Sequence, residues 1–139
     1  MIGSSLTKYR DVGLLILRLG IGGAFIAHGW PKISGGTGYW AGLGTAMPLP
    51  GHTFWGFMGA ITEFGGGILF AIGLLFRPVC ALLVIQMIVA ISYHLRLAPP
   101  PMNTWAIWSH PFEDLVVFLG MFLIGPGRYS VDGEPLTKR

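Results

Sequence analysis

Four long apolar segments account for most of the chain, separated by stretches rich in Gly, Pro or charge. A helix crosses the roughly 30 Å hydrocarbon core of a bilayer with about 20 predominantly apolar residues. The segments do not alternate between polar and apolar residues with period two, as the strands of a membrane barrel do. The pattern therefore predicts an all-α bundle of four transmembrane helices, a single domain over residues 1–139. We expect these helices at about residues 12–30, 55–76, 78–95 and 105–125.

The connections between these segments differ in length. A tight turn is expected at residues 76–78, whereas residues 31–54 form a long connection rich in Gly and Pro. A connection of that length is consistent either with a lid or re-entrant cap or with a flexible exposed loop. The fourth helix also allows two interpretations, because residues 111–125 are too short to span the bilayer. Either it begins earlier, near Trp105, or it begins at Pro111 and its outer end lies in a protein-lined recess.

Composition supports the membrane assignment. The chain is 53% hydrophobic and only 11% charged, whereas about a quarter of the residues in soluble domains are charged. The basic residues are scattered rather than clustered, and so no nucleic-acid-binding surface is predicted. The single cysteine, Cys80, excludes an intrachain disulfide, a CxxC redox centre and a thiolate zinc site. No metal site is predicted.

The basic residues also predict the orientation of the bundle. Lys and Arg are enriched in the cytoplasmic connections of membrane proteins. Six basic residues fall on one side of the predicted spans: Lys8, Arg10, Arg77, Arg128, Lys138 and Arg139. Lys32 and Arg96 fall on the other side, together with all five tryptophans, as expected of an aromatic belt. Both termini are therefore predicted to be cytoplasmic.

Polar side chains interrupt the predicted spans at similar depths. An ionisable group inside a spanning helix costs about 2.5–3.5 kcal/mol and therefore calls for a partner or a function. Counted at 1.5 Å per residue from the outer ends, three helices place polar groups about 12 Å deep. These groups are Glu63, Gln86, and the adjacent Glu113 and Asp114. Arg18 lies about 18 Å deep, and His28 and His94 lie nearer the outer surface. We interpret this layer as one polar site that opens to the outer side of the membrane.

The charged residues of this layer also have structural interpretations. Arg18 can extend to the cytoplasmic headgroups, and Glu113 and Asp114 can complement the N-terminus of a helix. Glu63 is the strongest functional candidate, because it lies deep within its span.

The histidines are similarly open to more than one interpretation. His28 and His94 can be interfacial hydrogen-bonding residues as well as ligands or proton carriers. A haem held between them is disfavoured, because nothing else in the sequence supports one. His52 and His110 are predicted to lie in loops.

Four motifs follow one another along the chain. They are RLGIGGAFIAHGWPK at 18–32, TEFGGGILFAIGLLFRP at 62–78, MIVA at 87–90 followed by His94, and Glu113 ahead of GPGRYSVD at 125–132. In this order they resemble the DoxX family over about residues 12–132. The resemblance implies a small bacterial inner-membrane protein of four helices. Its relatives include the DoxD subunit of a thiosulfate:quinone oxidoreductase and proteins linked to thiol, oxidative-stress, quinone or catechol systems. The family's recurring polar positions correspond here to Arg18, His28, Gly29, Lys32, Glu63, His94 and Glu113.

A quinone-linked redox function is our leading hypothesis. A quinone headgroup needs hydrogen-bond and proton donors below the membrane surface, within apolar walls. We predict Glu63, His94 and Glu113 as catalytic groups. The residues predicted to bind ubiquinone or menaquinone are Arg18, His28, Lys32, Gln86 and Asp114. The sequence has no haem-attachment motif, iron–sulfur cysteines or dinucleotide loop. Electrons would therefore come from a bound substrate or from a partner membrane or redox protein.

Two other functions fit the same pattern. The protein can be a non-enzymatic subunit or assembly partner of a larger complex, in which the polar layer fixes helix register. It can also be a small-metabolite permease, although four short helices without an evident internal repeat would need a homo-oligomer to form a path.

Overall fold

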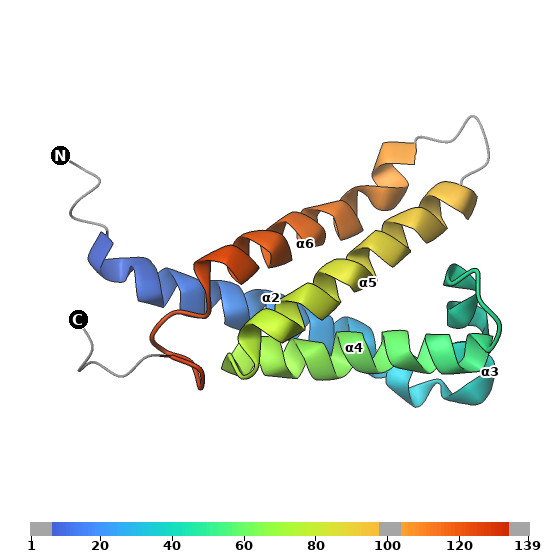
Figure 1. Ribbon diagram of the computed structural model, residues 1–139, viewed down its shortest axis with the longest axis horizontal. Coiled ribbons are helices and arrows are strands. Elements are labelled where there is room, and N and C mark those ends of the chain that lie inside the picture. Colours follow the sequence, from blue (N-terminus) through green and yellow to red (C-terminus); the bar gives the residue numbers. More distant parts are fainter. Residues whose placement is uncertain (1–6, 98–103, 134–139) are drawn as a thin grey trace.

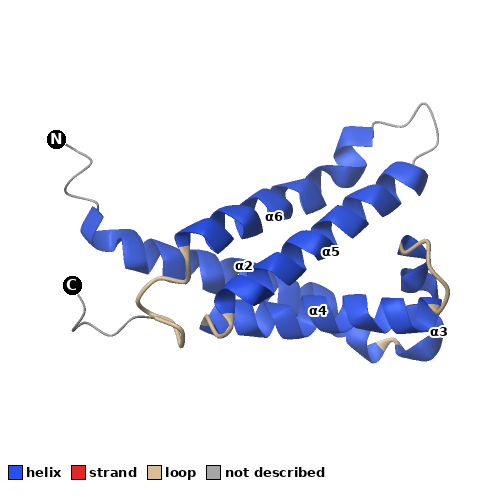
Figure 2. Cartoon of the chain, viewed as in Figure 1, coloured by secondary structure: helices blue, strands red, loops and turns tan. Residues whose placement is uncertain are grey.

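The computed structural model describes residues 7–97 and 104–133, and every regular element in those residues is helical (Figure 2). In chain order the elements are η1 (Thr7–Tyr9), α2 (Arg10–Ser34), α3 (Gly36–Leu43), η2 (Gly44–Ala46), α4 (His52–Ile72), α5 (Phe76–Leu97) and α6 (Thr104–Ile124). The four long helices, α2, α4, α5 and α6, are each long and apolar enough to cross a membrane. This confirms the prediction of an all-α protein with four spans. The cytoplasmic placement of both termini stays a prediction.

The four long helices form two pairs. α2 packs along α4, and α5 packs along α6, whereas α4 and α5 contact each other less extensively. Figure 1 shows α5 and α6 diverging from α4 toward the end of the bundle that carries α3. We call that end, with α3 and η2, the cap end. The opposite end, with the connection at residues 73–75 between α4 and α5, is the turn end.

Glycines allow α2 and α4 to approach closely. A Cβ atom on Gly22 would lie 2.7 Å from the Cβ of Ala71, and one on Gly29 would lie 2.6 Å from the backbone nitrogen of Phe64. Real Cβ atoms do not tolerate such distances, so only glycine fits at these contacts. Small residues at helix contacts are typical of membrane bundles, where van der Waals packing replaces the hydrophobic driving force.

Aromatic residues form much of the core nearer the turn end. Phe25, Phe70, Phe76 and Phe118 are buried, and Phe70 contacts Phe76 and Phe118 at ring-centroid distances of 5.1 and 5.2 Å. These residues come from all four long helices. Cys80 is buried beside them as a small apolar residue.

The long connection at residues 31–54 is a helical cap rather than a loop. α3 and η2 pack against the first half of α4, and the Trp40 ring lies 4.9 Å from the Phe57 ring. A Cβ atom on Gly56 would collide with the carbonyl oxygen of Trp40, which shows how closely the cap approaches α4. Of the two interpretations of this connection, the structure therefore supports the cap.

Two helix boundaries differ from the prediction at prolines. α2 was expected to end near residue 30, but it continues through Pro31 to Ser34. A proline within a helix removes one N–H donor and strains the turn before it; here the next turn of α2 nevertheless forms. α6 likewise begins at Thr104 and includes Pro111, so the interpretation with the earlier start is confirmed. His110 consequently lies on a helix, and His52 is the first residue of α4, so the prediction of both as loop residues was wrong.

The expected turn at residues 76–78 lies three residues earlier. α4 ends at Ile72, and Gly73 (φ 72°) donates its N–H to the carbonyl of Leu69 at 2.9 Å. A left-handed glycine is a common helix terminator. α5 then begins at Phe76, with Pro78 in its first turn, where a missing N–H costs little.

Residues 125–133 fold back onto the turn end and bind Arg18. The Arg18 side chain is completely buried and donates hydrogen bonds to the carbonyls of Ala71, at 3.3 Å, and of Tyr129. Backbone N–H groups of Val131 and Asp132 donate to the carbonyls of Ile72 and Gly73. Arg18 therefore does not reach the Glu63 layer. Instead it joins the C-terminal segment to α4.

The Asp132 carboxylate also accepts a hydrogen bond from the backbone N–H of Phe76 at 2.7 Å. It thereby caps the N-terminus of α5, whose first N–H groups have no partner within the helix. We expect Asp132→Ala to lower the free energy of unfolding by about 1 kcal/mol, as measured by reversible denaturation in mixed micelles. Asp132→Asn retains a capping oxygen and is expected to stay close to wild type. Equal losses in the two variants would contradict the cap.

Candidate functional site

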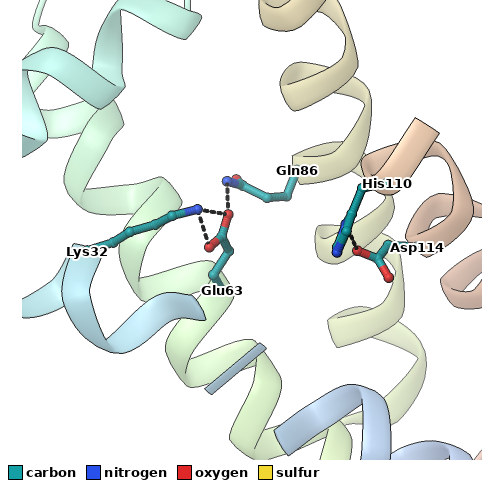
Figure 3. Close-up of polar contacts among 5 residues, drawn as sticks. All are labelled: Lys32, Glu63, Gln86, His110 and Asp114. Atoms are coloured by element: carbon teal, nitrogen blue, oxygen red, sulfur yellow. Dashed lines mark hydrogen bonds and ion pairs between the residues drawn. The ribbon is translucent and has the colours of Figure 1, made fainter. Parts of the chain in front are cut away.

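An ion pair between α2 and α4 lies at the centre of the candidate site (Figure 3). The ammonium group of Lys32 donates to both carboxylate oxygens of Glu63, at 2.7 and 2.5 Å. Gln86 on α5 donates to the same carboxylate from its amide nitrogen at 3.4 Å. The Glu63 side chain is 8% exposed and that of Lys32 is 28% exposed. The buried carboxylate is thus neutralised by a cation from α2 and accepts a hydrogen bond from α5, a helix of the other pair.

The local sequence explains how this pair forms. Lys32 lies in the last turn of α2, beyond Pro31, so it is presented only because the helix continues past the proline. Gly29, one turn earlier, brings α2 against the backbone of Phe64, the neighbour of Glu63. The charged groups therefore meet beside a close contact between the two helices.

A second polar cluster lies on α6 and α2. His110 and Asp114 are one turn apart on α6, and the His110 Nδ1 atom lies 3.1 Å from the Asp114 carboxylate. The His28 ring on α2 lies edge-on to the His110 ring at a centroid distance of 5.9 Å. The His110 side chain is 70% exposed, whereas that of Asp114 is 14% exposed. The cluster therefore connects an exposed imidazole to a largely buried carboxylate.

His94 on α5 has a defined tautomer when it is neutral. Its Nδ1 atom donates to the carbonyl of Ala90 at 2.7 Å, and a carbonyl oxygen can only accept. The proton of a neutral ring is therefore on Nδ1, which leaves Nε2 as an acceptor. On protonation, the same Nε2 atom becomes a donor.

These polar groups surround two adjoining cavities between the helix pairs. The larger has a volume of about 370 Å³ and is lined by the cap, α4 and α5 together with Lys32. The smaller has a volume of about 240 Å³ and is lined by α2, α5 and α6 together with Glu63. Four residues line both: Lys32, Glu63, Ala90 and His94. We call these cavities the large lobe and the small lobe, and the region of the four shared residues the neck.

The structure brings together most of the predicted site residues. Lys32, Glu63 and His94 lie at the neck, Gln86 lines the large lobe, and His28 and Asp114 line the small lobe. Gly29 lies behind them at the contact between α2 and α4.

Two predicted residues lie elsewhere. Arg18 bonds to Ala71, which is eight residues or about 12 Å along α4 from Glu63, and it lines neither lobe. Glu113 is exposed and also lines neither lobe. Since successive helical residues point in different directions, the acid that faces the cavity is Asp114.

Sequence reasoning missed His110, which lines the small lobe. Its spacing from Asp114, four residues along a helix, was the available signal, because such pairs share one helix face. Within residues 7–97 and 104–133, no group of three or more His, Cys, Asp or Glu side chains is arranged to hold a metal ion.

The fold and site define a small multi-pass membrane protein with a polar cavity between its helices. A family model described as DoxX matches residues 13–96, and the chain belongs to the DoxX family. It is also similar to the inner membrane protein YqjF of Escherichia coli K12, with 31% identity over 130 residues that cover 90% of this chain and 93% of the relative. No solved structure matches the chain. The relative and the four apolar helices together identify a multi-pass protein of the bacterial inner membrane.

The ion pair leads to a prediction for stability. Lys32→Met should lower the free energy of unfolding by about 1–3 kcal/mol, because it leaves the Glu63 carboxylate without its cation. Adding Glu63→Met should recover part of that loss, since the double variant has no unpaired charge. Reversible denaturation of both single variants and the double variant gives the coupling between the two residues. Strictly additive effects would show that the pair contributes nothing.

Lys8→Met is the matched control for this cycle. Lys8 is an exposed lysine near the turn end, and its replacement should change stability by no more than about 0.5 kcal/mol.

Proposed function

We propose that this protein binds a quinone headgroup at the neck and in the small lobe, in a membrane redox or oxidative-stress system. The observation that carries the proposal is the concentration of hydrogen-bonding groups inside an otherwise apolar cavity. Six of the eleven residues that line the small lobe are ionisable, and the rest are apolar. Ligand sites typically combine apolar walls with a few convergent polar groups in this way.

The polar groups suit the chemistry of a quinone. Its two carbonyl oxygens accept hydrogen bonds, which the ammonium of Lys32, the amide of Gln86 and a protonated His94 can donate. When bound, a quinone supplies an acceptor for two electrons and two protons. Glu63, Asp114 and the histidines can each hold or release a proton near such a ligand.

The distribution of charge supports a site that opens to the periplasmic side. Arg77 and Arg128 lie near the turn end, with Lys8 in η1 and Arg10 at the start of α2, whereas Lys32 and Arg96 lie near the cap end. Under the positive-inside rule, the turn end is cytoplasmic. The neck and both lobes lie toward the cap end, and so we place the site in the outer half of the membrane.

Direct titration tests the proposal. We expect the purified protein in lipid nanodiscs to bind a short-chain ubiquinone or a menaquinone analogue saturably. Glu63→Gln and His94→Ala should weaken that binding by at least about tenfold, or about 1.4 kcal/mol. His52→Ala is the matched control, because His52 is an exposed histidine at the start of α4 and lines neither lobe.

Binding that is unchanged in both site variants would rule out this site. Absence of any quinone binding, with a stoichiometric partner protein recovered from native membranes, would instead support the assembly-subunit function.

The adjacent acids of α6 give a further prediction. Asp114→Asn should weaken quinone binding severalfold, because Asp114 lines the small lobe and bonds to His110. Glu113→Gln should have no comparable effect, since Glu113 is exposed outside both lobes. The same titration measures both. A larger effect from Glu113 would contradict the orientation of α6 described above.

A further inference from the structure

The two lobes differ in chemistry although they share a neck. The small lobe is dominated by ionisable side chains, whereas only four of the 17 residues that line the large lobe are ionisable. Most of those four are the neck residues themselves. Away from the neck, the walls of the large lobe are mainly apolar or aromatic, including Met47, Trp55, Met58 and Val89.

The large lobe reaches the membrane-facing surface of the bundle. Leu82 and Ile85 on α5 line the lobe, and they are 55% and 57% exposed. Both lie in the middle of a span that is long and apolar enough to cross the bilayer. An apolar chain can therefore pass between the lobe and the lipid without crossing water.

The cap covers the other side of the large lobe. Leu43, Ala46 and Met47 from the cap line the lobe, and Arg96 of α5 donates a hydrogen bond to the carbonyl of Ala46. The cap is thus attached both to α4 and to α5. This contact covers the lobe at the cap end and leaves its lateral, lipid-facing side as the apolar opening.

We propose that the large lobe holds the isoprenoid tail of the quinone whose headgroup occupies the small lobe and neck. The inference rests on the proposed function and specifies its ligand as a prenylated quinone that enters from the lipid. The small lobe, the neck and the large lobe lie in the same order as the polar ring, its substituents and the apolar tail of such a molecule. Together the lobes fall within the range of volumes typical of small-molecule sites.

A substitution that fills the large lobe tests this assignment. Val89 lines only the large lobe, whereas its neighbour Ile88 is 51% exposed and lines neither lobe. We expect Val89→Trp to weaken binding of a ubiquinone with two isoprenoid units by about tenfold, through a clash with the tail. Binding of the tail-less ubiquinone headgroup should stay within about twofold of wild type, which also shows that the variant is folded. Ile88→Trp is the matched control and should change neither affinity.

The outcomes separate this inference from the proposed function. If the wild type binds neither ubiquinone, the proposed function fails. If both bind and Val89→Trp affects neither, the headgroup site stands and the tail assignment is wrong. If Val89→Trp abolishes binding of the tail-less headgroup as well, the headgroup occupies the large lobe and the assignment is reversed.

A second measurement does not depend on the Trp variant. A ubiquinone with a photoreactive diazirine at the end of its tail should label residues of the large lobe, such as Met58 or Met47, in the wild-type protein. Mass spectrometry of the digested protein locates the label. Labelling confined to the small-lobe residues of α6 would overturn the inference.

Discussion

The neutralisation of Glu63 by Lys32 is the constraint on which the half of the bundle that contains the two lobes depends. A carboxylate deep in a membrane-spanning helix is costly unless a cation and hydrogen-bond donors accompany it. Lys32 reaches Glu63 only because α2 continues through Pro31 and because Gly29 allows α2 to contact the backbone beside Glu63. The proline, the glycine and the lysine of the segment HGWPK thus have one structural consequence. Both lobes then form around this pair, with Gln86 and His94 contributed by the opposite helix pair.

The two ends of the bundle use buried charge in different ways. At the turn end, Arg18 donates to backbone carbonyls of α4 and of the C-terminal segment, and Asp132 caps α5. Those contacts join the two helix pairs and close that end. At the cap end, α5 and α6 diverge from α4 (Figure 1), and the charged and imidazole groups line cavities. The protein therefore combines a closed base with an end that can hold a ligand. Side chains held on rigid helices over such a base are well positioned for the binding that we propose.

The sequence predicted the parts of this arrangement that depend on local pattern. Long apolar runs indicated the four spans, and the cost of burying charge singled out Glu63. Depth counting placed Gln86 at the depth of Glu63 and His94 nearer the outer surface, and both side chains line the large lobe. Contacts between distant segments were not predictable in this way: the partner of Arg18 at Tyr129 is 111 residues away, and nothing local indicates it. The choice between Glu113 and Asp114 depends on how α6 is rotated, which follows from packing rather than from the sequence of α6. The cap was only one of two interpretations of residues 31–54. This Gly-rich segment folds through its contacts with α4, and the local pattern does not reveal those contacts.

The most direct test of the central claim is the lipid that accompanies the protein out of its own membrane. Wild-type protein and the Lys32→Met variant can be purified in parallel, extracted, and analysed for quinone by mass spectrometry, with a major phospholipid as the internal reference. A quinone site at the neck predicts that the wild type carries near-stoichiometric quinone, at a quinone-to-phospholipid ratio above that of the membrane. The variant should clearly lose that enrichment. A quinone-to-phospholipid ratio equal to that of the bulk membrane in both proteins would contradict it.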